Sequence, residues 1–239
     1  MAYALHYWPS IPGRGEFVRL TLEAAGADYR DVARLPDGGG IAAMMARPDG
    51  EPLRPPFAPP YLADGDLVIG QTAAILLYLG PRLGLVGPDE ADRIWTHQIQ
   101  LTIADAVAEA HDTHHPVGAS LYYEEQIPEA KRRAADFRET RMPKFLGWFE
   151  RVLARNPAGP DHLVGDATSY ADLSLFQLVE GLRYAFPRAA ERTLAETPRV
   201  VALADGVARQ PRVAAYLASP RRCAFNEDGV FRRYVELDA

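Results

Sequence analysis

The sequence predicts an α/β unit at the N-terminus followed by an all-α helical unit. Two observations predict this class. Strand and helix patterns alternate within the first 80 residues as β-α-β, a loop and β-β-α, which is typical of a small mixed sheet with helices on its faces. Beyond a segment rich in proline and glycine, strand patterns nearly vanish and long helical runs take their place. We expect domains at residues 1–80 and 89–239, joined by a linker at 81–88.

The composition is that of an ordinary globular protein, because 48% of the 239 residues are hydrophobic and 24% are charged. The formal net charge of −6 argues against a general binder of nucleic acid or of anionic membranes. No apolar run approaches the roughly 20 residues that span a bilayer, and the N-terminus lacks the basic and apolar regions of a secretion signal. The single cysteine, Cys223, rules out an internal disulfide. We therefore expect a cytoplasmic protein.

The N-terminal unit begins with a strand, a helix and a second strand. Residues 4–8 form a short run rich in β-formers, which Pro9 ends. A helix is expected over 14–25, because its apolar residues follow a helical spacing and Gly26 supplies a C-terminal stop. A weaker strand covers 27–33. This order gives the first β-α-β unit.

A proline pair, a hairpin and a helix start follow one another within residues 59–72. Asp64-Gly65 is a strong hairpin signal, because glycine accepts positive φ without steric cost. Thr72 is expected to cap a short apolar helix that Gly80 closes. The proline pair favours a cis bond, which exposes backbone to a ligand beside the helix N-terminus. Because amides and the helix dipole favour a carboxylate there, the stretch predicts a site for an extended, carboxylate-bearing small molecule.

The second unit is predicted to be a set of helices. One long helix is expected over 89–115, and a second helical run contains Pro143, which should kink or break it. Ser169 and Asp172 form a helix start of the capping-box type, with Asp in place of the usual Glu. The helix that follows is apolar on most sides, so it should lie in the core. The second helical run covers 128–156, the core helix covers 173–185, and two shorter helices cover 199–208 and 211–217.

Four motifs occur in order along nearly the whole chain. They are Tyr7-Trp8-Pro9…Gly13-Arg14, Asp64-Gly65-Asp66-Leu67…Gln71-Thr72-Ala73-Ala74-Ile75-Leu76, Val164-Gly165-Asp166…Ser169-Tyr170-Ala171-Asp172 and Arg209-Gln210-Pro211…Tyr216-Leu217. Together they resemble the cytosolic glutathione transferases, and the first motif resembles the tyrosine-type classes, pi, mu, alpha and sigma. The chain most resembles a bacterial-type member of this family. The resemblance implies the glutathione transferase architecture, which combines a thioredoxin-like glutathione-binding domain with an all-α domain that carries the electrophile pocket. It also implies a homodimer and a role in detoxification.

The resemblance makes Tyr7 the catalytic residue. The thiol of glutathione is mostly protonated at neutral pH, and the thiolate is the nucleophile. A tyrosine hydroxyl aimed at the sulfur favours the thiolate by donating a hydrogen bond to it. From the residues alone, an ordinary core aromatic is the favoured interpretation of Tyr7, because aromatic residues are common in strands. Ser10 supports a rival mechanism in which a serine hydroxyl takes this part, whereas Cys223 lies too far along the chain for a cysteine-type enzyme.

By the same resemblance, Tyr7, Arg14, Gln71 and Thr72 bind glutathione, the last two at its γ-glutamyl end. The alternatives are that Thr72 only caps its helix and that Arg14 is solvated. Two further glutathione-binding residues follow from the proline pair. Pro60 falls at the family's cis-proline, and Pro59 falls at the residue whose backbone N–H and C=O pair with the cysteinyl unit. Because proline has no N–H, one contact is lost, at a cost of about 0.5–1.5 kcal/mol of binding.

The rest of the site is less well matched. The family's Trp and Lys ligands of the glycyl carboxylate have no clear equivalents, and Arg47 and Arg54 are the candidates. Asp105 falls roughly where a long-helix aspartate of the partner subunit reaches the glutamyl amine; a polar residue on a packed helix is the alternative. Aromatic walls suit apolar electrophiles. The electrophile pocket is therefore assigned to Trp8, Ser10, His115, Tyr122 and Tyr123.

Three histidines lie close together in the sequence. The spacings of His111, His114 and His115 place two or three imidazoles on one helical face, which metal sites use. No carboxylate or cysteine motif accompanies them, and Pro116 ends the helix. We therefore expect these side chains to line the substrate pocket, with no metal.

The sequence predicts a dimeric, cytosolic glutathione transferase in which Tyr7 stabilises the thiolate that attacks an apolar electrophile. Glutathione is the expected co-substrate, and no metal, nucleic acid or membrane is expected to bind. Two alternatives stay open. One is a non-catalytic glutathione-transferase-like binding protein, which the missing amide at Pro59 and the absent glycyl ligands support. The other is an isomerase that uses glutathione without consuming it.

Overall fold

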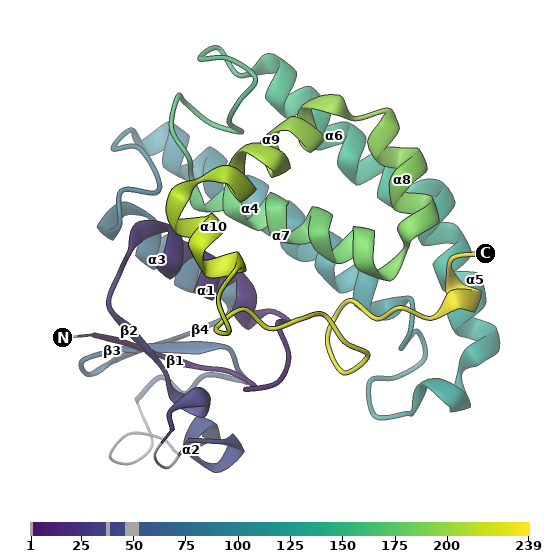
Figure 1. Ribbon diagram of the computed structural model, residues 1–239, viewed down its shortest axis with the longest axis horizontal. Helices are drawn as coiled ribbons and strands as arrows, with labels where there is room; N and C mark the ends of the chain where they lie inside the picture. The colour runs from purple at the N-terminus through teal and green to yellow at the C-terminus, as the bar shows by residue number, and fades with distance from the viewer. Residues whose placement is uncertain (1, 37–38, 46–52) are drawn as a thin grey trace.

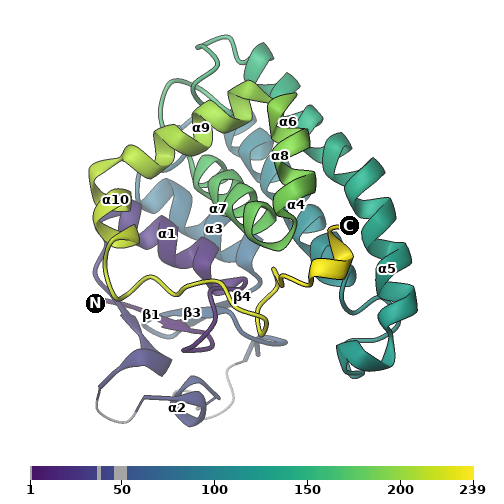
Figure 2. The same cartoon turned by 45° about the vertical axis from the view of Figure 1, so that its right-hand side comes forward.

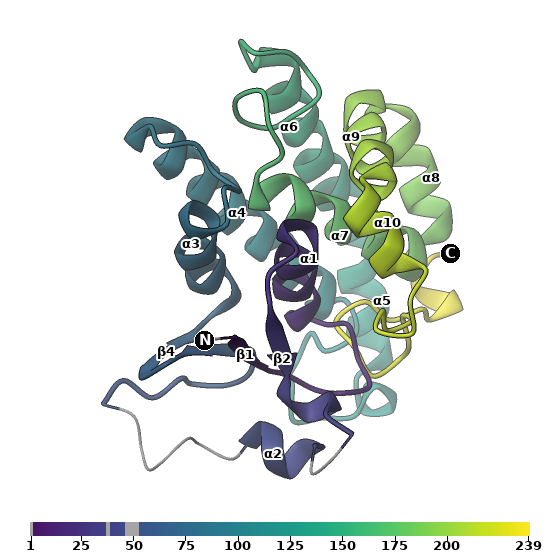
Figure 3. The same cartoon turned by 60° about the vertical axis from the view of Figure 1, so that its left-hand side comes forward.

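The computed structural model describes residues 2–36, 39–45 and 53–239, and its N-terminal part is a four-stranded mixed sheet with helices (Figure 1). The strand order is β2-β1-β3-β4, with β1 parallel to β2 and antiparallel to β3. Helices α1 and α3 cover one face, and the short helix α2 lies on the other side (Figure 3). The elements are β1 Tyr3–His6, α1 Gly15–Ala25, β2 Tyr29–Asp31, η1 Val32–Arg34, α2 Ile41–Met45, β3 Tyr61–Asp64, β4 Leu67–Gly70 and α3 Thr72–Arg82.

The rest of the chain is helical and is built around α7, which is buried at every residue except Glu180, Arg183 and Tyr184. Helices α4, α8 and α9 pack on α7, and so does α1 from the sheet part (Figure 1). The elements are α4 Glu90–Asp112, η2 Tyr123–Glu125, α5 Ile127–Asp136, η3 Phe137–Arg141, α6 Met142–Arg155, α7 Tyr170–Ala185, α8 Pro187–Ala195, α9 Pro198–Arg209, α10 Pro211–Leu217 and η4 Val235–Leu237. The predicted fold class is therefore confirmed, while the division at 81–88 stays a prediction.

The central hairpin and the core helix form as the sequence predicts. Gly65 has a φ of 58° in the turn between β3 and β4, and the Pro59-Pro60 peptide bond is cis. At the start of α7, Ser169 N–H donates to the Asp172 carboxylate at 2.7 Å, and the Ser169 hydroxyl oxygen accepts from Asp172 N–H. These reciprocal bonds are the predicted capping box, and they satisfy amides that a buried helix start would otherwise leave unpaired.

The two ends of α3 differ from the prediction. The helix begins at Thr72 and its N-cap is Gln71, so Thr72 does not cap it. Its hydroxyl instead donates to the Arg14 carbonyl at 3.3 Å. At the other end the helix passes through Gly80 and stops at Arg82. A Cβ at Gly80 would lie 2.6 Å from the ring of Tyr170, so this glycine allows α3 to pack closely on α7 rather than ending the helix.

The long helix α4 ends earlier than predicted, at Asp112 rather than at residue 115. The Thr113 hydroxyl donates to the Ala110 carbonyl at 2.7 Å, so a side chain replaces a helical amide there. His115 also precedes a proline, which disfavours the helical conformation. His114 and His115 therefore lie in the turn after α4 and not on its face, contrary to the prediction.

The predicted break near Pro143 and the short later helices are present, but one helix was missed. The π-helical segment η3 separates α5 from α6 directly before Pro143, which lies in the first turn of α6. Helix α8 was not predicted. Its signals were Pro187 at the first helical position and buried Ala190 and Leu194 at helical spacing.

The C-terminal tail, residues 218–239, has no clear period in the sequence, yet it is held along its length. It leaves α10, crosses the junction between the sheet part and the helices, and ends beside α5 (Figures 1 and 2). The Asp238 carboxylate accepts the N–H groups of Arg188 and Ala189 and so caps α8. None of the described helices combines the length and the apolar character that crossing a lipid bilayer requires.

Candidate active site

Three predicted parts of the site meet at one end of the sheet. In the antiparallel pairing, His6 of β1 lies opposite Tyr61 of β3, and Tyr61 lies opposite Gly70 of β4. The next residues outward are Tyr7 after β1, Pro60 before β3 and Gln71 after β4. Strand register alone therefore brings together segments that are more than fifty residues apart in the sequence.

Tyr7 is 4% exposed and is enclosed by the turn that leads into α1. A Cβ at Gly13 would lie 2.1 Å from its hydroxyl oxygen, and a Cβ at Gly15 would lie 2.3 Å from its ring. Both positions therefore require glycine for the tyrosine to fit. The Arg14 N–H, between them, donates to the Tyr7 hydroxyl oxygen at 2.9 Å. The sequence thus places this side chain by two glycines and one backbone hydrogen bond.

The surroundings of Tyr7 keep its hydroxyl protonated. Burial raises the pKa of Tyr7, while the backbone N–H of Arg14 and the charges of Arg14 and Arg19 act in the opposite direction. The oxygen accepts a hydrogen bond from Arg14, so its own proton is left to donate. The guanidinium of Arg19 lies 5.6 Å from the centre of the ring. The group is therefore a hydrogen-bond donor in a positively polarised setting, which favours an anion beside it.

The N-terminus of α3 offers a second anion-binding feature. Gln71 has a φ of 64°, a left-handed conformation that is uncommon outside glycine and that marks many functional sites. No side chain caps α3. Its first amides therefore face the site with the positive end of the helix dipole. The Arg14 backbone joins the two features, because its N–H binds Tyr7 and its carbonyl accepts the Thr72 hydroxyl.

A pocket of about 320 Å³ lies between the starts of α1 and α3 and the middle of α4, and Tyr7 is not among the residues that line it. Arg14, Gln71 and Thr72 line it. The role in glutathione binding that the resemblance assigns to these three residues stays a prediction. His97 Nδ1 and Gln100 Oε1 are buried and have no hydrogen-bond partner among the described residues. The α4 part of the lining was missed, because only the packing of α4 on α3 identifies it. The remaining lining residues are Phe17, Ala73, Ala74, His97, Gln100, Leu101, Ile103, Ala104 and Val107.

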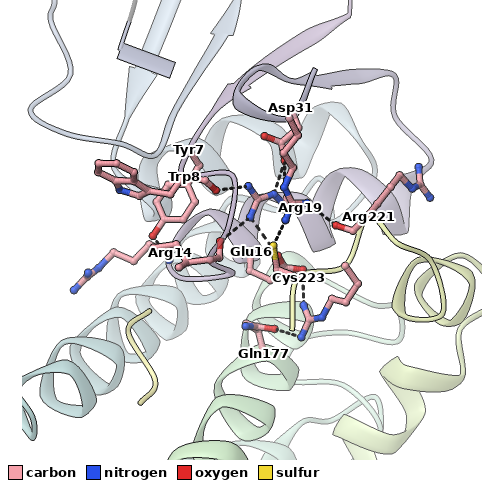
Figure 4. Close-up of polar contacts among 12 residues, drawn as sticks. Tyr7, Trp8, Arg14, Glu16, Arg19, Asp31, Gln177, Arg221 and Cys223 are labelled. Carbon is pink, nitrogen blue, oxygen red and sulfur yellow. Dashed lines mark hydrogen bonds and ion pairs between the residues drawn. The ribbon is translucent and has the colours of Figure 1, made fainter. Parts of the chain in front are cut away.

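A buried ion network supports the loop after β1 (Figure 4). Arg19 is fully buried, and its Nε lies 2.6 Å from Asp31 Oδ2. Its other nitrogens donate to the carbonyl oxygens of Trp8 and Ile11, at 3.2 and 3.4 Å. Since a buried guanidinium is stable only with such partners, the network fixes both the charge and the path of the loop. Sequence analysis missed Arg19, because no motif marks it.

The grouping of the five residues predicted for the electrophile pocket stays a prediction. None of them lines the 320 Å³ pocket. Trp8 is 37% exposed and Tyr122 is 77% exposed. Tyr123 is buried, stacks on Tyr234 at a centroid distance of 3.8 Å and donates its hydroxyl to Glu236 at 2.9 Å. The C-terminal tail, which sequence reasoning left unassigned, therefore occupies the surroundings of Tyr123.

The tail also covers the loop after β1. Asn226 donates to the carbonyl oxygen of Ser10 at 2.9 Å, and the Ser10 side chain is exposed. The guanidinium of Arg34 donates to the Cys223 thiol, and the Cys223 thiol lies 3.5 Å from the carbonyl oxygen of Pro9. The expectation that Cys223 lies far from the loop after β1 is therefore wrong, because the tail folds back over this loop. No local sequence signal marks these contacts, because they join residues more than 180 positions apart.

The remaining predicted residues lie apart from the pocket. Asp105 is exposed on α4, and its negative charge contributes to the raised pKa of Arg141. Arg54 is exposed, and Arg47 lies outside the described residues. His115 lies in the turn after α4, with its Nδ1 2.5 Å from that of His114. The roles assigned to these residues by resemblance stay predictions.

Comparison with known proteins points to one family. The family model described as "Glutathione S-transferase, C-terminal domain" matches residues 111–220. Glutathione S-transferase P 1 of Xenopus laevis is 27% identical over 222 residues, which cover 92% of this chain and 93% of the relative. Glutathione S-transferase P of Bos taurus is 29% identical over 221 residues, covering 91% and 92%.

Solved structures agree on the fold. The pi-class glutathione S-transferase of Onchocerca volvulus superposes with a TM-score of 0.65 at 21% identity, covering 90% of this chain and 92% of the other. The glutathione S-transferase of Ascaris lumbricoides gives a TM-score of 0.66 at 21% identity, covering 94% and 99%. The similarity extends over the sheet part and the helical part alike.

Proposed function

The chain is a member of the cytosolic glutathione transferases, and from this premise we propose that Tyr7 stabilises the glutathione thiolate for attack on an apolar electrophile. The observation that carries the proposal is the state of the Tyr7 hydroxyl. It is buried, it accepts the Arg14 N–H at 2.9 Å, and its own proton is left for an outside acceptor. A thiolate is the acceptor that best matches a donor in this positively polarised place.

The chemistry follows from the groups at this end of the sheet. Loss of the thiol proton leaves a sulfur anion, which the Tyr7 O–H stabilises by one hydrogen bond. The sulfur lone pair then forms a C–S bond to the electrophilic carbon, and the displaced electron pair leaves with the leaving group or takes up a proton. Stabilisation by a hydroxyl needs no metal ion, so the transfer as proposed uses glutathione as its only co-substrate.

The rest of glutathione is proposed to lie along the proline pair and the start of α3. The γ-glutamyl carboxylate suits the uncapped amides of α3, together with Gln71 and the Thr72 hydroxyl. The cysteinyl unit would pair with the carbonyl of Pro59 alone. Arg14, which lines the same pocket, supplies positive charge beside them. In this proposal, glutathione, a tripeptide with two carboxylates, extends from the proline pair to the start of α3.

Three further features belong to the proposal. A homodimer would bring Asp105 of one subunit toward the glutamyl amine bound by the other. Trp8, exposed near the start of the loop after β1, supplies an aromatic surface for an apolar electrophile. The expected location is the cytoplasm, and the expected role is detoxification.

The Tyr7→Phe variant tests the central assignment. Conjugation of a chlorodinitrobenzene should lose roughly 100-fold in kcat/KM, the order of magnitude that one lost oxyanion donor costs. Ser10→Ala is the matched control and should keep conjugation near the wild-type rate. Retention on immobilised glutathione should be unchanged in both variants. Full activity of Tyr7→Phe would remove the role from Tyr7, and loss of activity in Ser10→Ala alone would move the role to the serine.

A non-catalytic binding protein is the second candidate, and the absent N–H of Pro59 favours it. It predicts that the wild-type chain is not retained on immobilised glutathione and conjugates no electrophile. Product analysis also identifies the third possibility, an isomerase, because glutathione would then be recovered unconsumed while the second substrate is rearranged.

A further inference from the structure

Three imidazoles meet at the C-terminal end of α4. One ring nitrogen from each of His111, His114 and His115 can be chosen so that all three lie within 4.8 Å of one another. The ring centroids are 4.7 to 5.4 Å apart. His114 is 1% exposed, while the other two are half-buried. The cluster forms because α4 ends at Asp112, so the turn after it folds the last two rings back onto the first.

Hydrogen bonds fix the state of the central ring. His114 Nε2 lies 2.8 Å from the carbonyl oxygen of Val230, which can only accept, so Nε2 carries the proton. The Nδ1 atom of His114 is therefore unprotonated and carries a lone pair. It lies 2.5 Å from the Nδ1 of His115. Two ring nitrogens this close need a proton or a cation between them, because two facing lone pairs would repel.

The first ring is arranged in a similar way. His111 Nδ1 lies 3.4 Å from the carboxylate of Asp112, so the proton belongs on Nδ1 and the Nε2 lone pair is free. Metal-binding histidines almost always donate their second ring N–H to a carboxylate or a backbone carbonyl. His111 and His114 each show one of these two arrangements.

We propose that His111, His114 and His115 form a three-histidine site for a divalent transition-metal ion of the Zn²⁺ type. Neutral imidazoles suit zinc, copper, nickel and cobalt. Tetrahedral zinc with Zn–N bonds of about 2.0–2.1 Å holds its ligand nitrogens about 3.4 Å apart. The Nδ1 atoms of His114 and His115 are closer than this, at 2.5 Å, and one nitrogen of each ring can be chosen so that all three separations are at most 4.8 Å. Small rotations of the half-buried His111 and His115 rings would equalise them.

The charges around the cluster fit neutral ligands. Burial lowers the pKa of all three imidazoles, that of His114 to about 3. The hydrogen bonds of His111 and His114 already leave one lone pair free on each of these two rings. The positive charge of the Arg232 guanidinium acts on all three rings and opposes binding of a cation there. Arg232 Nε donates to the Gly229 carbonyl at 2.9 Å. The negative charges of Asp112 and Glu124 act on the cluster and favour binding of a cation.

The site would tie the C-terminal tail to the end of α4. The Val230 carbonyl orients His114, so bound metal and the position of the tail are coupled. With three protein ligands the fourth position is open, as in zinc sites that bind water or a small ligand. The site uses none of the residues proposed to stabilise the thiolate.

Metal binding by the full chain, prepared without a histidine tag, tests the proposal. Zn²⁺ is titrated in competition with a chromophoric chelator, and Co²⁺ is followed by its visible absorption. One equivalent should bind with micromolar or tighter affinity, and bound Co²⁺ should show the intense bands of four-coordinate geometry. His111→Gln and His115→Gln should each weaken Zn²⁺ binding by about 100-fold or more. Asp112→Asn, which alters only the orienting group, should weaken it by about 10-fold.

His162→Gln is the matched control, because His162 lies outside the cluster and is also half-buried. It should bind Zn²⁺ as the wild type does. Thermal unfolding without metal shows whether each variant is folded, and Zn²⁺ should raise the Tm of the wild type but not of His115→Gln. Millimolar binding, or equal binding by wild type, His111→Gln and His115→Gln, would overturn the site.

Discussion

Pro59 takes one backbone donor away from the place where the cysteinyl part of glutathione is proposed to lie. It is half-buried, and it precedes Pro60, which continues into the buried strand β3. A proline here leaves a carbonyl acceptor and no N–H. The carbonyl of the cysteinyl unit then binds water or has no hydrogen-bond partner. The affinity for glutathione should therefore be lower than it would be with a backbone N–H at residue 59.

Pro59→Ala should therefore bind glutathione more tightly than the wild type. One regained hydrogen bond is worth about 0.5–1.5 kcal/mol, which corresponds to a dissociation constant lowered roughly 2- to 10-fold. Isothermal titration measures it directly. Pro55→Ala, an exposed proline in the same segment, is the control and should leave affinity unchanged. Equal affinity of Pro59→Ala and wild type would show that the cysteinyl unit does not pair at this backbone.

At the residue scale, sequence reasoning works where a motif carries the chemistry. Tyr7, Arg14 and Thr72 were identified from motifs, and the structure joins them through the Arg14 backbone. The cap assigned to Thr72 was wrong, because a cap depends on which φ the preceding residue adopts. Here Gln71 has a φ of 64° and is itself the N-cap.

The contact between α4 and the α5–α6 pair depends on Glu109. Its carboxylate accepts two nitrogens of Arg141, at 2.6 and 2.8 Å, and one of Arg133, at 3.1 Å. Arg141 lies in η3, the π-helical segment before Pro143. The hydrogen bonds from Arg141 are the main cause that lowers the pKa of Glu109. The pair thus fixes the interrupted helix to the long one.

Glu109→Gln should lower the free energy of unfolding by about 1–2 kcal/mol at pH 7. Because the folded pKa lies below that of the unfolded chain, the wild-type advantage is fully present above the unfolded value of about 4.3 and is lost as pH falls through the folded value. Urea unfolding at several pH values should show the two proteins converging in acid. Glu191→Gln, an exposed carboxylate on α8, should match the wild type throughout. A pH-independent difference would contradict the assigned ion pair.

At the element scale, local pattern predicts which segments are helices and strands, and packing decides where they end. The hairpin and the Ser169–Asp172 start were predicted because each is a local hydrogen-bond arrangement. Gly80 was mistaken for a stop, since nothing local shows that Tyr170 packs against it. The end of α4 was misplaced for a similar reason, because the bond from Thr113 to Ala110 replaces the helical one.

The whole molecule is joined across its two parts by a buried charge network on α1. Glu16 is fully buried and binds Arg19, the Tyr216 hydroxyl at 2.6 Å and the guanidinium of Arg222. Arg222 in turn donates to Gln177 of α7 at 3.0 Å. Helices α1, α7 and α10 and the tail therefore share one set of polar contacts beneath the loop of Tyr7 (Figure 4).

These contacts lie beyond sequence reasoning. Glu16 and Arg222 are 206 positions apart, and each alone is one of many charged residues. A charged residue in an amphipathic helix is expected to face solvent, whereas Glu16 and Arg19 are buried inside α1. The burial of Glu16 and Arg19 can be explained only from the folded structure, in which the tail supplies Arg222 as a partner. The same holds for the histidine cluster, whose orienting carbonyl comes from Val230.

Arg222→Met tests how strongly the tail holds the two parts together. Breaking a buried ion pair by removing one partner typically costs about 3–5 kcal/mol, but Glu16 keeps Arg19 and Tyr216, so the loss should be nearer to 2–3 kcal/mol. Guanidinium chloride unfolding measures it, and methionine preserves the packing of the arginine stem. Arg209→Met, at the exposed end of α9, is the control and should stay within about 0.5 kcal/mol of the wild type. If the two variants are equally stable, the packing of α1 on α7 holds the parts together, and the tail contributes nothing measurable through this network.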